Sequence, residues 1–207
     1  MTVNAFCTVD PFKALEKCDR VYYCGNEKFD DDRIVTFTPF ADGVTADNIY
    51  IADMTDFDAL ESACDHLINS GAHAIVRAAY DLTESGIVEA KFKLSPIMLL
   101  HKLGVLGSCT VAGGVCLDND DLDLMAQEGV PVVVTPTASA GYGYGIAPVF
   151  AAYKRGIRIG IGTFDGRYNR SHDLDFEVEF LKLTSNADMR RADVFSRGDT
   201  KKFLDFD

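Results

Sequence analysis

Apolar and polar residues follow a repeating order of strand-like and helix-like segments from about residue 57 onward. Residues 57–70 place apolar side chains at helical spacing and stop at Gly71, which predicts a helix. Residues 130–136, "VPVVVTP", form a continuous run rich in β-branched residues, which is typical of a parallel strand buried on both faces. The order of these segments predicts a parallel sheet built from strand–helix units.

Seven strands are predicted in all, and the pattern is less regular in the first half of the chain. The strands are "TVNAFCTV" (2–9), "DRVYYCG" (19–25), "RIVTFTPF" (33–40), "AHAIVRAAY" (72–80), "SCTVAGGVC" (108–116), "VPVVVTP" (130–136) and "IRIGIGT" (157–163). Further helices are predicted at 12–18, 95–104, 118–129 and 147–156. Seven strands are one fewer than a closed barrel of this kind contains. We therefore predict an α/β fold, a parallel (β/α) barrel of the TIM type that is incomplete.

Composition and charge narrow the class of protein. The 207 residues are enough for one domain, which we place at 1–185, with a charged tail at 186–207. A net charge of −12 argues against nucleic acid or an anionic membrane as partner, because both bind basic surfaces. No apolar run reaches the ~18–20 residues that cross a bilayer, and the start of the chain has no basic segment of a secretory signal. Six widely spaced cysteines fit reduced thiols, so we expect a cytoplasmic protein.

The segment 139–148, "SAGYGYGIAP", has glycines at alternate positions before a predicted helix. It is not a dinucleotide fingerprint, because Ile146 stands where G-x-G-x-x-G requires glycine, and it lacks the G-K-[ST] ending of a P-loop. Glycine permits close backbone approach, so we name Gly141 and Gly143 as candidates for binding a small anion. The alternative is a strand–helix loop packed against its own tyrosines.

Polar residues at the ends of predicted strands are the other candidates, because the carboxyl ends of barrel strands carry the active site. Arg77 interrupts an apolar strand, and a buried arginine calls for a carboxylate partner. Tyr80 follows it, and Asp165 comes just after the strand at 157–163. Asp165 and His172 are catalytic candidates, with turn capping and a solvated loop histidine as the alternatives. No histidine spacing indicates a metal site.

Three longer stretches carry a resemblance to a known family. They are "LSPIMLLHKLGVLG", "VCLDNDDLDLMAQEGVPVVVTPTASAGYGYGIAPV" and "KRGIRIGIGTFDG". In this order and spacing, residues 73–184 resemble the C-terminal half of an amidohydrolase-superfamily barrel, in the branch of cytosine, guanine and S-adenosylhomocysteine deaminases and triazine hydrolases. The resemblance implies a zinc or iron ion that activates water for attack on a C–N or C–Cl bond. It also implies that the chain begins near the family's second strand, so that the first strand and its H-x-H metal ligands are missing.

Carried over position by position, the functional residues of the family are replaced in this chain. The positions are occupied by Arg77 for the fifth-strand histidine, Tyr80 for the proton-transferring glutamate, Gly113 and Cys116 for the sixth-strand histidines, Val134 for the seventh-strand histidine, and Phe164 for the eighth-strand aspartate, with Asp165 one place later. A divalent ion would have too few ligands here and would face a guanidinium. The comparison therefore predicts no bound metal.

From these replacements we expect a degenerate amidohydrolase-like domain that binds a small ligand or takes part in oligomerisation. Arg77 would occupy the vacated metal space and pair with Asp165. The residues expected to bind the ligand are Arg77, Tyr80, Asp165, Gly141 and Gly143. An incomplete barrel exposes strand edges, so we also expect a homo-oligomer or a companion chain that completes it.

Two alternatives stay open. One is a metal-dependent C–N hydrolase or deaminase, with zinc or iron as cofactor, whose site is either completed by a partner or relocated to Asp165, His172, Asp173 and Cys116. The other is an enzyme of another class that binds an anionic ligand at Arg77 and the 141–145 loop.

Overall fold

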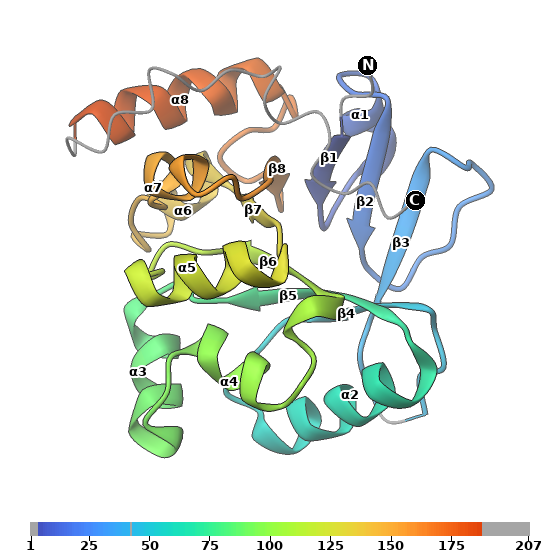
Figure 1. Cartoon of the computed structure of the whole chain (residues 1–207). Coiled ribbons are helices and arrows are strands. Elements are labelled where there is room, and N and C mark those ends of the chain that lie inside the picture. Colours follow the sequence, from blue (N-terminus) through green and yellow to red (C-terminus); the bar gives the residue numbers. More distant parts are fainter. Residues whose placement is uncertain (1–3, 42, 188–207) are drawn as a thin grey trace.

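Eight parallel strands in chain order form a closed barrel in the computed structural model, which describes residues 4–41 and 43–187. The strands are β1 Asn4–Cys7, β2 Arg20–Cys24, β3 Ile34–Pro39, β4 Asn48–Ile51, β5 His73–Ala78, β6 Cys109–Gly113, β7 Val132–Val134 and β8 Ile159–Phe164. The helices are α1 Pro11–Leu15, α2 Phe57–Ser70, α3 Leu82–Phe92, α4 Pro96–Lys102, α5 Asn119–Glu128, α6 Pro136–Gly141, α7 Val149–Lys154 and α8 Leu174–Ala187, with a 3₁₀ turn η1 at Leu106–Ser108. The helices lie outside the strands (Figure 1), which confirms the predicted parallel β/α barrel.

The predicted gap in the barrel is corrected by the structure. The missed strand is β4, whose four residues, "NIYI", are too few to show a period and follow a polar loop. β1 pairs with β8, so the barrel closes and has no first-strand gap. A closed barrel has no exposed strand edges, so these edges are no longer a reason to expect a companion chain. A partner or a homo-oligomer stays a prediction. The proposed boundary at residue 185 also stays a prediction; α8 ends at Ala187, and the tail beyond it lies outside the described residues.

The interior of the barrel is filled unequally by its two halves. β1 to β4 contribute four buried aromatic side chains, whereas β5 to β8 contribute smaller residues at the corresponding depth. The aromatic residues are Phe6, Tyr22, Phe37 and Tyr50; the smaller ones are Ile75, Ala112, Val133 and Gly162. The large side chains of one half therefore occupy the space that the small ones leave.

The seam between β1 and β8 depends on a glycine. Phe6 pairs with Gly162, and a Cβ on Gly162 would lie 2.5 Å from the Phe6 carbonyl oxygen and 2.7 Å from its Cβ. Because the closest of these atoms is backbone, no change of rotamer relieves the clash. Only glycine lets the two strands approach this closely.

The described residues show no helix that is both long and apolar enough to cross a membrane. None of the six cysteines, all of which lie within the described residues, forms a disulfide.

The closure seam predicts opposite effects for the same substitution at two glycines. Gly162→Ala should lower the free energy of unfolding by about 1–3 kcal/mol or more, because the added methyl group overpacks the seam. Gly86→Ala should raise it by roughly 0.5–1 kcal/mol, because Gly86 is an exposed position within α3 with no atom near the added Cβ. Urea unfolding of the two variants and the wild type measures both. Equal effects at the two sites would contradict the account of the seam.

Candidate active site

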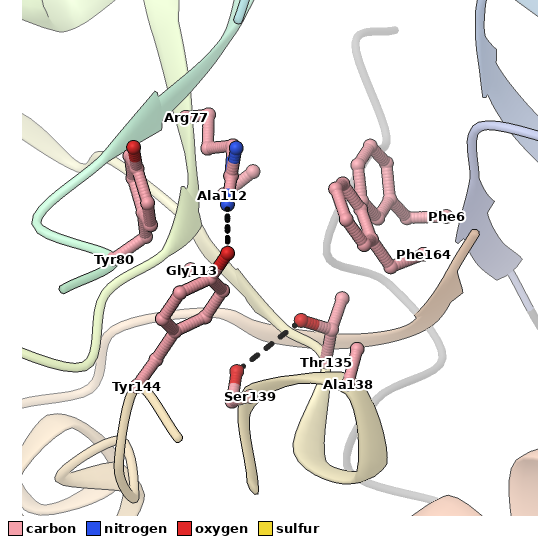
Figure 2. A pocket seen from close by; sticks show the side chains of 10 residues that line it. All are labelled: Phe6, Arg77, Tyr80, Ala112, Gly113, Thr135, Ala138, Ser139, Tyr144 and Phe164. Carbon is pink, nitrogen blue, oxygen red and sulfur yellow. Dashed lines mark hydrogen bonds between the residues drawn. The ribbon is translucent and has the colours of Figure 1, made fainter. Parts of the chain in front are cut away.

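A pocket opens at the carboxyl end of the barrel strands, which is the end that carries active sites in this fold. Its lining residues are Phe6, Arg77, Tyr80, Ala112, Gly113, Thr135, Ala138, Ser139, Tyr144 and Phe164. Figure 2 shows Arg77 and Tyr80 on one side, Phe6 and Phe164 facing them, and the two hydroxyl residues Thr135 and Ser139 at the base. The space left free between these side chains is about 20 Å³. That is room for about one water molecule, so a larger ligand has to displace a side chain.

Arg77 points into this pocket from the end of β5. It follows the interior residue Ile75 by two positions and therefore faces the inside of the barrel. The carbon of its guanidinium lies 3.6 Å from the centre of the Tyr80 ring and 5.2 Å from that of Phe164. Aromatic faces attract cations, so the rings partly compensate the guanidinium for lost water.

The expected ion pair between Arg77 and Asp165 is absent, and this corrects the view that the arginine needs a carboxylate. In the described part of the chain no ion pair joins Arg77 to any acid. Its one hydrogen bond to a described residue runs from Nη2 to the Tyr144 hydroxyl, at 3.1 Å. Arg77 is only half-buried, and the neighbouring rings replace the carboxylate.

The turn after β5 places Tyr80 over Arg77. Ala79 has φ 50°, a left-handed conformation that is uncommon outside glycine. Its backbone N–H donates to Oε1 of Glu84 at 3.4 Å, and Glu84 is buried in the first turn of α3. On the next strand, Gly113 has φ 107°, and a Cβ there would lie 2.6 Å from the Tyr80 Cβ. The absence of a side chain at Gly113 is what gives Tyr80 its place.

Asp165 supports the pocket from outside. The Tyr142 hydroxyl donates a short hydrogen bond to its Oδ2, and the Arg167 backbone N–H donates to its Oδ1 at 3.0 Å. The ring of Tyr142 stacks on Tyr144, with centroids 5.5 Å apart. Asp165 therefore holds Tyr142, which supports Tyr144, which in turn accepts the hydrogen bond from Arg77. Asp165 does not line the pocket.

The glycines of the 139–148 segment do not line the pocket either. Gly141 ends α6, and a Cβ there would overlap the Tyr168 ring at 2.5 Å. Gly143 has φ 76° and lies between the two stacked tyrosines. Both glycines shape the loop that presents Tyr144, and anion binding at Gly141 or Gly143 stays a prediction.

His172 lies on the outer side of the barrel wall. Its side chain is buried, so the alternative of a solvated loop histidine is wrong. Its Nδ1 lies 2.5 Å from Oγ1 of Thr163. Thr163 alternates with the inward-facing Gly162 and Phe164, so the pair faces away from the pocket. Burial lowers the pKa of His172, which favours the neutral ring. The structure does not bring this catalytic candidate to the pocket.

Sequence reasoning missed six residues of the pocket: Phe6, Ala112, Thr135, Ala138, Ser139 and Tyr144. Thr135 and Ser139 are buried, and their hydroxyl oxygens lie 3.4 Å apart. The sequence could have pointed to Thr135, because it is a polar residue near the carboxyl end of the predicted strand "VPVVVTP", where active-site residues lie in this fold. None was present for Phe6, because only closure of the barrel brings β1 next to β8.

The chain resembles known proteins both in sequence and in fold. No protein-family model matches the chain. A 5-methylthioadenosine/S-adenosylhomocysteine deaminase of Caldicellulosiruptor saccharolyticus is 29% identical over 113 residues, covering 54% of this chain and 26% of that protein. The enzyme of the same name from Thermococcus onnurineus is 26% identical over 151 residues, covering 70% and 36%. In sequence the chain is similar to enzymes of the deaminase branch of the amidohydrolase superfamily.

Solved structures show the same barrel. An adenosine deaminase of Xanthomonas campestris with bound zinc has a TM-score of 0.66 at 17% identity, over 85% of this chain and 41% of its own. A guanine deaminase of C. acetobutylicum with guanine in its active site has a TM-score of 0.65 at 13% identity, over 97% and 55%. At these identities the likeness concerns the fold alone. This chain spans about a quarter to a third of the length of the two curated relatives that it matches.

These matches overturn the expectation of a degenerate domain that only binds a ligand or a partner. The curated relatives are named as deaminases, and the structural neighbours include deaminases and a triazine hydrolase. They support a deaminase-like enzyme and agree better with the alternative interpretation, a C–N hydrolase whose site is relocated or completed by a partner.

The metal ion of the amidohydrolase branch does not fit the side chains of this pocket. Within residues 4–41 and 43–187, no group of three or more His, Cys, Asp or Glu side chains could hold a metal ion. The relocated set is also dispersed: Asp165 bonds Tyr142, His172 bonds Thr163, and Asp173 accepts from the first backbone N–H groups of α8. Cys116 is half-buried, and burial raises its pKa. The described residues of the chain therefore do not supply the ligands of a divalent ion.

The buried carboxyl of Glu84 predicts a pH-dependent stability. Burial raises its pKa from 4.5 to about 7, and nearby Asp81 adds to the shift. Between these values the folded protein holds a proton that the unfolded chain releases, so the free energy of unfolding falls as pH rises and is lowest above pH 7. Glu84→Gln keeps a neutral side chain of similar shape. The variant should gain up to about 3 kcal/mol over wild type between pH 4.5 and 8.

Urea unfolding of both proteins at several pH values measures this gain. Glu89→Gln is the matched control, because Glu89 is exposed on the same helix and should show no such pH-dependent difference. A Glu84→Gln advantage that stays constant across pH would contradict the account.

Proposed function

We propose that the chain is a C–N hydrolase of the deaminase type, acting on an amino-substituted planar nitrogen heterocycle held in the pocket at the barrel mouth. The observation that carries the proposal is the coincidence of this pocket with the family's functional positions. Arg77, Tyr80, Gly113 and Phe164 stand where the resemblance places catalytic or ligating residues, and all four line the pocket. The deaminase names of the curated relatives support the same reaction type.

In such a reaction the oxygen of water bonds to a ring carbon, and the bond from that carbon to the amino nitrogen breaks. The nitrogen leaves as ammonia with one proton of the water, and the other proton stays on the product, which is the hydroxyl or keto form of the ring. The residues of the pocket bind and orient the ring. Tyr80, Tyr144 and Phe164 offer aromatic faces to a flat ligand. The Arg77 guanidinium can stabilise negative charge that develops on the ring in the transition state.

We further propose that a partner, either a second copy or a companion chain, completes the site. The support is the dispersal of titratable side chains among the described residues, since no nucleophile–base pair is gathered in the pocket. Zinc or iron belongs to this proposal only as a group held with the partner's help. The absence of disulfides among the six cysteines supports a reducing compartment, and we propose that the protein is cytoplasmic and binds neither nucleic acid nor membranes.

The proposal predicts release of ammonia from amino-substituted rings. The purified chain would be assayed with adenosine, guanine, 5-methylthioadenosine and S-adenosylhomocysteine, with zinc, with iron and with chelator. Arg77→Met should lower kcat/KM by about tenfold to a thousandfold, because the charge stabilising the transition state is lost. Arg158→Met is the matched control; Arg158 is exposed next to the start of β8, at the opposite end of the barrel.

Partner completion has a separate readout. If a second copy completes the site, the rate per chain rises with protein concentration as dimers form. If a companion chain does, activity appears only on adding it from a lysate of the source cells. No ammonia from any substrate under all these conditions would overturn the proposed function.

A further inference from the structure

The donors of Arg77 are largely unused within the described structure. A guanidinium has five N–H donors, which lie in its plane. The guanidinium carbon lies over the Tyr80 ring, 3.6 Å from its centre, and this contact uses none of the N–H donors. One bonds Tyr144, and no described side chain provides a second hydrogen bond or an ion pair. A fixed cation with free donors is suited to a planar, doubly accepting anion.

The nearby acids do not neutralise this charge. Asp165 is engaged with Tyr142, and Glu84 is buried outside the barrel wall with its pKa raised to about 7. Asp81 accepts from the backbone N–H of Glu84 at the start of α3. The chain carries a net charge of −12, yet the centre of its pocket holds an arginine without an ion pair in the described residues.

Hydroxyl groups complete the polar side of the pocket. Thr135 and Ser139 are buried, and their mutual distance of 3.4 Å is at the limit of a hydrogen bond. They lie at the base of the pocket, with Tyr144 on one side and the aromatic wall of Phe6 and Phe164 on the other (Figure 2). The pocket thus combines one cation, several hydroxyls and flat apolar faces.

We propose that the substrate of this site is anionic, a planar nitrogen heterocycle that carries a carboxylate, and that Arg77 binds this carboxylate through two of its N–H groups. That this ligand is a substrate rests on the proposed function. That Arg77 binds its carboxylate does not. Entry of the ring requires Tyr80 or Tyr144 to move, because the free space holds about one water molecule. The ring then stacks on the aromatic walls while its polar edge faces Thr135 and Ser139.

The test compares matched pairs of heterocycles that differ in charge. Isothermal titration would measure the Kd of orotate against uracil and of nicotinate against nicotinamide, at low and at 0.5 M salt. We expect each acid to bind at least tenfold more tightly than its neutral partner at low salt, and this preference to shrink at high salt. Arg77→Met should abolish the preference, and Arg77→Lys should retain part of it, because a lysine keeps the charge without the fork.

Thermal unfolding of each variant shows whether it is folded, and Arg158→Met should bind like wild type. Equal affinity for the acid and its neutral partner, or a preference that survives Arg77→Met, would overturn the inference. The titration measures binding without turnover, so its result is independent of the ammonia assay. If the protein releases ammonia from neutral rings but does not bind the acids, the proposed function is supported and the inference of an anionic substrate is wrong.

Discussion

Closure of the barrel at the seam between β1 and β8 is the constraint on which the other features depend. Phe6 can enter the interior only because Gly162 has no side chain. Two residues further along β8, Phe164 lies against Phe6, with ring centroids 6.3 Å apart. The seam therefore supplies a whole wall of the pocket, and it lies opposite Arg77 (Figure 2). A side chain at Gly162 would disturb both the barrel and the pocket.

The second determinant is the way in which the barrel holds a positive charge at its mouth. Moving a guanidinium partly out of water costs desolvation free energy. An ion pair with a carboxylate would offset this free energy but would also neutralise the charge. The rings of Tyr80, Tyr144 and Phe164 offset part of the desolvation free energy by attracting the cation, and they do not neutralise its charge. Strain at Ala79 and the missing side chain of Gly113 are the local features that place Tyr80 over the arginine.

The sequence predicted the barrel class, most elements and the polar strand end that carries Arg77 and Tyr80. These features are local: a buried β-branched run, a helix cap, or a charge in an apolar strand. β4 was missed because four residues show no period. The role of Asp165 was not predictable, since its partner Tyr142 comes from another loop. The burial of His172 against Thr163 likewise depends on how the segment after β8 packs on the wall.

The position of the pocket across the seam has a consequence for folding. Phe6 and Phe164 come from nearly opposite ends of the described chain, so their contact closes a very long loop, a kind of contact that forms slowly. A chain in which β2 to β8 had already paired would possess Arg77, Tyr80 and Phe164 but would lack Phe6, and its opposite wall would be incomplete. The binding site thus exists only in the fully closed barrel. A ligand bound there therefore opposes opening of the first strand, and its free concentration sets how often that strand detaches.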